Sequence, residues 1–244
     1  MEWRSEGAIL SMRPHGESAA IIEVFTALKG RHSGVVRGGA SRRMAAHLQP
    51  GSQVDVTWRA RLGEHIGGFG AEPVRARAGI LGDSLALAGL NAICALLHVA
   101  LPEREAMGAF YDRTISLLDA LEAGADWPCD YLRWEQALLE ALGYGLDLTR
   151  CAVTGGREDL AFVSPKSGRA VSRAAAGPWE GRLLPLPAMM LGQGPGDDRE
   201  VLQGLAITGH FLARGLEAVL NGRPLPEARN RLLARIERRA SQMF

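Results

Sequence analysis

Residues 18–58, SAAIIEVFTALKGRHSGVVRGGASRRMAAHLQPGSQVDVTW, contain the features from which the fold and function of this chain are predicted. An apolar run rich in β-formers, 19–28, turns at Lys29-Gly30, and a second run, 33–36, leads into the basic loop RGGASRR at 37–43. Between Glu23 and Asp55 there is no carboxylate but there are five cations: Lys29, Arg31, Arg37, Arg42 and Arg43. Such a group around the turns of a small β-domain indicates a polyanion-binding surface, although for any one arginine a solvated loop is the better interpretation.

The sequence on both sides of this stretch predicts further short strands. Val54, Val56 and Trp58 alternate with polar residues, which places them on a core face and puts Arg59 and Arg61 in the outer row. An apolar run at 7–12 and a glycine-rich segment at 63–70 complete the pattern. Residues 1–80 are therefore predicted to form a small β-barrel, and periodicity alone does not distinguish an OB-type barrel from an SH3-like one.

Charge is distributed unevenly along the chain. The 244 residues have a formal net charge of only +1, so any affinity for nucleic acid must come from local charge. Residues 1–80 hold 11 Lys and Arg against 7 Asp and Glu, an excess of four positive charges, and the remainder is net negative. This asymmetry favours the N-terminal domain as the one that faces a polyanion.

The residue pattern changes at residue 81, where Leu and Ala begin to recur at helical spacing. Helices are predicted at about 84–101, 103–122 and 130–142, forming a helical domain over 81–150. Residues 151–181 have the turns and short apolar runs of a hairpin insert. Two more helices, at about 199–220 and 226–239, lie in the last segment, 182–244, and are expected to pack back onto the helical domain.

No motif for catalysis, secretion or membrane insertion is found in the sequence. There is no G-x-S-x-G, Walker loop or H-E-x-x-H, and the six histidines show no metal-ligand spacing, so no catalytic residue and no cofactor are predicted. Three scattered cysteines do not make a disulfide framework, and there is no signal peptide or apolar run of about 20 residues. We therefore expect a cytoplasmic, non-enzymatic protein with no membrane contact.

The insert begins with Cys151 in a turn-rich context that is typical of a zinc ribbon, which needs two C-x-x-C pairs because Zn²⁺ takes four ligands. Thr154, Ser172 and Ala175 stand where the other three cysteines would be. One thiol cannot hold structural zinc, so no metal ligand is predicted. The insert is instead expected to be held by the packing of Leu160, Phe162 and Val171.

Several motifs together carry a resemblance to a known family. They are WRSEGAIL at 3–10, the RGG turn at 37–39, YLRWE at 131–135, LLEALGYG at 138–145 and FVSPKSGRAV at 162–171. In this order the chain resembles the RecO recombination-mediator family of bacteria. The resemblance implies an α+β protein: an N-terminal OB-fold barrel followed by a helical domain with a zinc-finger-like insert. Many relatives have four cysteines in that insert, and this chain keeps one.

The resemblance also implies a function. RecO-like proteins bind single- and double-stranded DNA, anneal complementary strands, and help load recombinase onto strands coated by single-strand binding protein during recombinational repair. They work with RecR and with the acidic C-terminal tail of single-strand binding protein, in the nucleoid. Cations on an OB surface can follow phosphates without reading sequence. We expect phosphate contacts first from Arg37, Arg42 and Arg43, and then from Lys29, Arg31, Arg59 and Arg61.

For the acidic tail, Arg133 matches the family's helix, and Arg104 or Arg113 could lie beside it to bind a carboxylate. The alternative for Arg133 is an intrahelical pair with Asp130. The arginine row of the last helix, 226–239, is interpreted as a solvated face or a second DNA patch. Two other functions remain open at this point: an adaptor whose barrel binds a protein, and, less favoured by the ligand count, a metal-dependent hydrolase.

Overall fold

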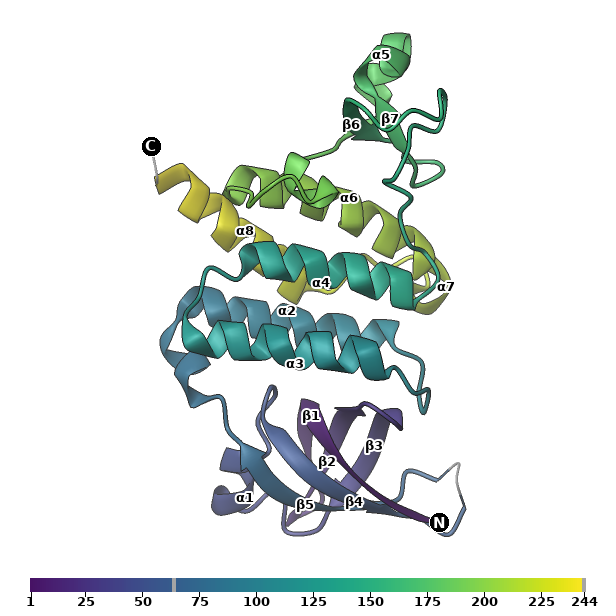
Figure 1. Cartoon of the computed structure of the whole chain (residues 1–244). Coiled ribbons are helices and arrows are strands. Elements are labelled where there is room, and N and C mark those ends of the chain that lie inside the picture. The colour runs from purple at the N-terminus through teal and green to yellow at the C-terminus, as the bar shows by residue number, and fades with distance from the viewer. Residues whose placement is uncertain (63–64, 243–244) are drawn as a thin grey trace. The chain divides into compact units, whose positions relative to one another are not determined.

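The computed structural model describes residues 1–62 and 65–242. The chain divides into two compact units, Met1–Ala125 and Asp126–Phe244, coloured purple to teal and teal to yellow in Figure 1. This division falls inside the helical domain predicted over 81–150, because the first two helices of that domain belong to the same unit as the barrel.

The N-terminal part of the first unit is a closed five-stranded barrel with the order β1-β2-β3-β5-β4. Its elements are β1 (Glu2–His15), β2 (Ala19–Thr26), β3 (Gly30–Val36), α1 (Arg42–His47), β4 (Gln53–Arg59) and β5 (Gly68–Arg75). All neighbouring strands pair antiparallel except β3 and β5, which close the barrel in parallel at Val35 and Gly68. The predicted OB-fold barrel is thus confirmed, with a first strand longer than the apolar run at 7–12 had suggested.

The barrel is filled by the alternate residues of its strands. Val54, Val56 and Trp58 are buried in one cluster with Ile22, Val24 and Phe69, as their period of two predicts. Leu48, which follows α1, is fully buried in the same cluster. Trp58 is therefore a core residue, as the alternation predicts.

Two helices, α2 (Ser84–Ala100) and α3 (Gly108–Ala123), complete the first unit after a short 3-10 helix, η1 (Ala78–Gly82). They pack on the outer face of the barrel, where the ring of Phe25 lies 5.4 Å from that of Tyr111 in edge-to-face geometry. α3 begins at residue 108 and not at the expected 103. The intervening backbone is bound to β3, since Arg104 N–H donates to the carbonyl of Arg31 at 2.9 Å.

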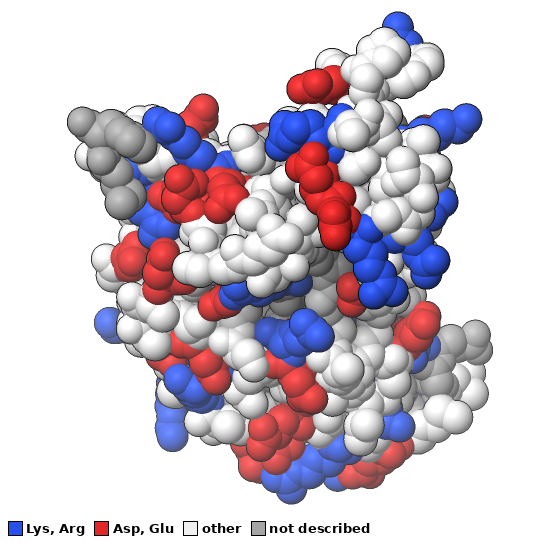
Figure 2. Space-filling view, turned by 45° about the horizontal axis from the view of Figure 1, so that its top comes forward, with Lys and Arg blue, Asp and Glu red and all other residues white. Residues whose placement is uncertain are grey.

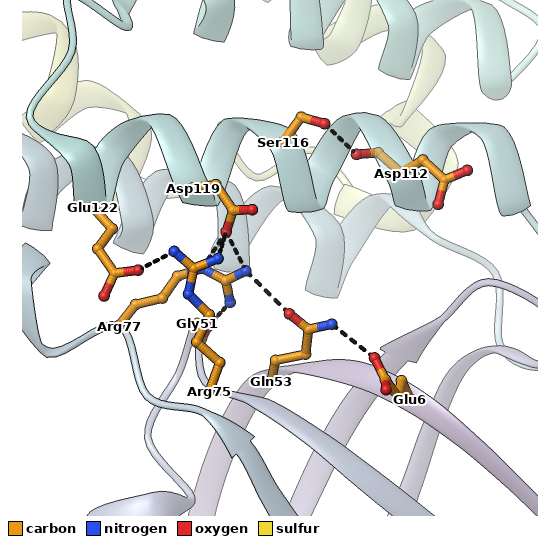
Figure 3. A network of polar contacts seen from close by, with 9 residues as sticks. All are labelled: Glu6, Gly51, Gln53, Arg75, Arg77, Asp112, Ser116, Asp119 and Glu122. Carbon is orange, nitrogen blue, oxygen red and sulfur yellow. Dashed lines mark hydrogen bonds and ion pairs between the residues drawn. The ribbon is translucent and has the colours of Figure 1, made fainter.

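A network of ion pairs joins α3 to the barrel (Figure 3). The guanidinium of Arg77, only 5% exposed, donates to Asp119 at 2.6 Å and to the carbonyl of Gly51 at 2.7 Å. Arg75 reaches the same Asp119 carboxylate at 2.9 Å and Glu122 at 2.6 Å. Two arginines of the basic N-terminal segment therefore stabilise the fold through ion pairs with α3.

The second unit contains three main helices and the insert. The helices are α4 (Pro128–Ala141), α6 (Asp198–Gly215), followed by the short α7 (Glu217–Leu220), and α8 (Glu227–Gln242). The insert has a three-stranded sheet with the order β7-β6-β8 and short helical turns: β6 (Leu160–Val163), β7 (Ala170–Ser172), β8 (Leu184–Pro185), α5 (Arg173–Ala176), η2 (Gly177–Arg182) and η3 (Ala188–Leu191). The expected helix over 199–220 is divided at Leu216. α6 packs against both α4 and α8.

A buried ion pair holds these three helices together. Glu135 of α4 is fully buried and accepts from Arg229 of α8 at 2.8 and 2.9 Å and from the Thr208 hydroxyl of α6 at 2.5 Å. Arg229 also donates to the carbonyl of Leu205 at 2.6 Å. Charge and hydrogen-bonding capacity are thus matched inside the core, which is the condition for a buried pair to be tolerated.

Replacing Arg229 by Met should lower the free energy of unfolding by roughly 3–5 kcal/mol, because it leaves the Glu135 carboxylate buried without its counter-charge. The double variant E135L/R229M, which removes both charges, should recover much of this loss. Urea denaturation of the three proteins measures both effects. A loss below about 1 kcal/mol for R229M would contradict this account of the core.

The stability of the first unit should depend on His32. Burial lowers the pKa of this imidazole from 6.5 to about 4, assisted by the positive charges of Arg104 and Lys29 and opposed by Glu103. The unfolded chain therefore takes up a proton between about pH 6.5 and 4 that the folded chain does not. Unfolding free energy should fall as pH falls through this window.

In His32→Leu this dependence on pH should become shallower, as denaturation at several pH values would reveal. His15→Leu is the matched control, since His15 is exposed on β1. Equal slopes for wild type and H32L would show that His32 is not the titrating group.

Candidate nucleic-acid interface

The basic loop between β3 and α1 has a defined conformation. Gly38 adopts a φ of 69°, and a Cβ on Gly39 would lie 2.9 Å from that of Ala20 and 3.0 Å from the Val36 carbonyl. The N–H of Ala40 donates to the carbonyl of Ser18 at 3.1 Å, which ties the loop to the β1–β2 turn. The Ser41 hydroxyl then caps α1 by accepting from the N–H of Met44. The backbone that carries the cations is thus held in place by the barrel.

Three of the predicted phosphate contacts lie together on this loop and helix. Arg37 follows β3, and Arg42 and Arg43 are the first two residues of α1; all three are exposed. Their side chains form no hydrogen bond or ion pair with another residue in the described ranges, 1–62 and 65–242. Cations at a helix N-terminus oppose the helix dipole, so local stability does not explain Arg42 and Arg43.

A fourth cation, Arg13, was missed by the sequence reasoning. It lies opposite Ile21 of β2, which in turn lies opposite Val35 of β3, so that Arg13 stands on the outer face of the sheet two residues before the turn. Predicting β1 as far as His15 would have placed it there. Glu17, in the same turn, is an exposed carboxylate, and it reduces the positive charge of this edge.

Lys29 and Arg61 lie on other connections of the barrel. Lys29 is exposed in the β2–β3 turn, and Arg61 is exposed in the connection between β4 and β5. Figure 1 shows this connection and α1 on opposite sides of the barrel. Arg61 therefore does not extend the group formed by Arg37, Arg42 and Arg43, and Lys29 is separated from that group by the length of β3.

The other two predicted DNA contacts are paired with carboxylates. The side chain of Arg31 is only 14% exposed, with its guanidinium 3.2 Å from Glu23 and 2.9 Å from the carbonyl of Leu101. Arg59 is exposed but lies 2.8 Å from Glu2. Positive and negative side chains are also interspersed on the face seen in Figure 2. Within the described ranges, the cations of the barrel that stay available to a polyanion are those without a carboxylate partner.

Comparison with known proteins divides the chain into an N-terminal and a C-terminal region, which correspond to the barrel and to the helices that follow it. Residues 1–77 match the family described as "Recombination protein O N terminal", and residues 81–224 match "Recombination protein O C terminal". The chain is 67% identical to "DNA repair protein RecO" of Cereibacter sphaeroides over 238 residues, covering 98% of this chain and 99% of that protein. The proteins of the same description from Roseobacter denitrificans and Ruegeria sp. are 60% and 58% identical over 240 residues, which cover 98% of this chain and all of each relative.

The chain belongs to the RecO family of DNA repair proteins. In this RecO protein the insert departs from a zinc-binding design. The Cys151 thiol is buried with Phe162, Val171 and Ala176, in the packing expected for the insert. Ser172, at a position where a ligand would stand, donates its N–H at 3.3 Å and its hydroxyl at 3.4 Å to the Cys151 sulfur. The residues present do not fit Zn²⁺, and in the described ranges no three His, Cys, Asp or Glu side chains gather as a metal site would require.

These same hydrogen bonds change the acidity of the thiol. Burial raises the pKa of Cys151, but donors from Ser172 and Thr154 outweigh it and lower the pKa from 9.0 to about 6. The hydrogen bonds thus stabilise the thiolate where zinc would do so in a four-cysteine ribbon.

The residues predicted to receive the acidic tail are not collected within one unit of this RecO protein. Arg133 on α4 belongs to the second unit and forms the intrahelical pair with Asp130, at 2.9 Å. Arg104 and Arg113 belong to the first unit, and Arg104 donates to the carbonyl of His65 at 3.2 Å. The arginine row of α8 also has structural members, since Arg229 is in the core and Arg239 pairs with Asp198.

Within the described residues, no helix is both long and apolar enough to span a membrane.

Metal analysis of the purified protein should find well below one zinc per chain, because a single thiol cannot complete four-fold coordination. The matched variant T154C/S172C/A175C restores the four-cysteine spacing and should bind zinc close to one per chain. Stoichiometric zinc in the wild type that is lost in Cys151→Ser would overturn the interpretation of the insert.

Proposed function

We propose that this chain is a recombination mediator that binds DNA through the phosphate backbone and performs no bond-breaking chemistry. The observation that supports this most is the group Arg37, Arg42 and Arg43, exposed and without carboxylate partners in the described ranges, on a loop held by the barrel. Guanidinium groups in a fixed arrangement bind phosphate oxygens strongly and without regard to base sequence. Arg13, on the outer face of the sheet in β1, would add a further phosphate contact.

Strand annealing follows from contacts of this kind. Two complementary strands repel each other through their phosphates, and cations that neutralise them lower this repulsion while leaving the bases unread and available for pairing. No general acid or base is required for that step. We further propose, from the family, that the chain helps load recombinase onto DNA coated by single-strand binding protein, and that it acts with RecR.

For the acidic tail of single-strand binding protein we propose Arg133 as the receiving cation. Its pair with Asp130 is half exposed on both sides, and such surface pairs contribute little to stability. A tail carboxylate can therefore replace Asp130 as the partner at small cost.

The variant R37A/R42A/R43A should bind a fluorescent oligonucleotide more weakly, and its plot of log K against log salt should be shallower by about 2 for single strands, since three phosphate contacts are lost. A salt titration of fluorescence anisotropy measures both quantities. The control is R4A/R75A/R173A, which removes the same charge from arginines that are already paired with carboxylates.

If the two triple variants behave alike, the loop is not the DNA site. If neither they nor the wild type bind DNA with a salt dependence, the chain is better described as an adaptor whose barrel binds a protein.

A further inference from the structure

A groove in the second unit has the features of a binding site and takes no part in the function described so far. It has a volume of about 400 Å³ and lies between the segment after α4, the turn after β6 and the end of α6. Its lining consists of Gly143, Tyr144, Gly145, Lys166, Ser167, Gly168, Phe211, Arg214, Gly215 and Glu217. A second hollow of about 350 Å³ shares Arg214 and Glu217 with it and adds His210 and Arg223, so the groove continues along the helix.

Tyr144 provides an exposed aromatic surface in this groove. Tyr144 is 46% exposed, yet its ring lies directly on the backbone of α6: a Cβ on Gly215 would be 2.5 Å from the ring Cδ2 and 2.7 Å from Cε2. The N–H of Tyr144 donates to the carbonyl of Leu139 at 2.8 Å, which fixes the backbone that carries the ring. The ring thus lies against the glycine of α6 and is in part exposed at the groove.

The groove also has positive charge that is held in position. His210 and Arg214 of α6 both bond the carbonyl of Pro165, at 2.9 and 2.5 Å, and Arg214 also reaches the carbonyl of Lys166 at 3.2 Å. These bonds fix the turn 164–168, which presents the exposed Lys166 at the groove. Lys166, Arg214 and Arg223 face a single carboxylate, Glu217, so the lining of the two hollows is net positive.

We propose that this groove binds an unpaired nucleotide of single-stranded DNA, with the base stacked on Tyr144 and the adjoining phosphates at Lys166, Arg214 and Arg223. A supported aromatic ring beside several cations is the combination by which proteins hold single strands without reading their sequence. Gly143 leaves space in the lining, since nothing lies within 4 Å of the position that a Cβ would take there. An acidic peptide would use the cations but does not account for the exposed ring.

The proposal rests on the proposed function, in that the ligand is the same DNA. It adds a second contact, on the second unit, with a different preference. Bases inside a duplex are stacked on each other and cannot reach Tyr144. The phosphates that Arg37, Arg42 and Arg43 would contact are present in both single and double strands. The groove should therefore favour single strands, which gives the protein separate contacts for a strand that is already paired and one that is still open.

The test compares the full-length variants Y144A and Y144F in binding a fluorescein-labelled oligothymidylate and a duplex of equal length. Loss of one stacked base should weaken single-strand binding by about 5- to 150-fold in Y144A and leave duplex binding unchanged. Y144F, which retains the ring, should bind as the wild type does. Trp179→Ala removes another exposed aromatic of the second unit, outside the groove, and should have no effect. Equal binding by Y144A and the wild type, or an equal loss for duplex, would overturn the proposal.

Photocrosslinking distinguishes failure of this proposal from failure of the barrel site. An oligonucleotide with 5-iododeoxyuridine should crosslink to Tyr144, mapped by mass spectrometry, in both the wild type and R37A/R42A/R43A. If Y144A weakens binding and the triple variant does not, the barrel site fails and the groove stands; the reverse result removes the groove alone. If an acidic peptide with a free C-terminal carboxylate binds the wild type but not Y144A, while single-strand binding is unchanged in Y144A, the groove is a peptide site and the proposal is wrong.

Discussion

The pairing of arginine with carboxylate is the interaction on which this structure depends most. In the first unit Arg77 joins the barrel to α3 through Asp119, and in the second unit Arg229 joins α8 to α4 through Glu135. A guanidinium can be buried only if its charge and its donors are satisfied, so each of these contacts requires a particular geometry of the elements around it. The same interaction decides which cations are left for a ligand.

The proposed DNA contacts are made by arginines that have no carboxylate partner in the described ranges. Arg37, Arg42 and Arg43 are presented by a loop whose shape is set by Gly38 and Gly39, so little backbone order has to be acquired on binding. In the second unit the cations stand beside a supported ring. Charge and stacking are different means of holding a strand: the first responds to salt and accepts any strand, whereas the second needs an open base.

The insert shows how a small, turn-rich segment can be held together by one thiol and a few apolar side chains. A zinc site would hold the turns at Cys151 and Ser172 together by coordination, and here they are held by hydrogen bonds to one sulfur and by a small apolar cluster with Phe162. The turn after β6 remains anchored to α6 through Pro165. The insert can therefore present Lys166 at the groove without a metal ion.

Much of the fold was determined by the sequence alone. The alternation of Val54, Val56 and Trp58 gave the barrel core, and the glycines and leucine spacing gave the turns and most helices, because these signals are local and depend only on side-chain period and backbone freedom. The same reasoning identified the basic loop at 37–43. Only the tertiary structure decided that Arg31 and Arg59 are paired and that Tyr144 lies on Gly215. The partners in these contacts are as many as 71 residues apart in the chain, and ion pairing and ring contacts depend on distance in space, which no local pattern records.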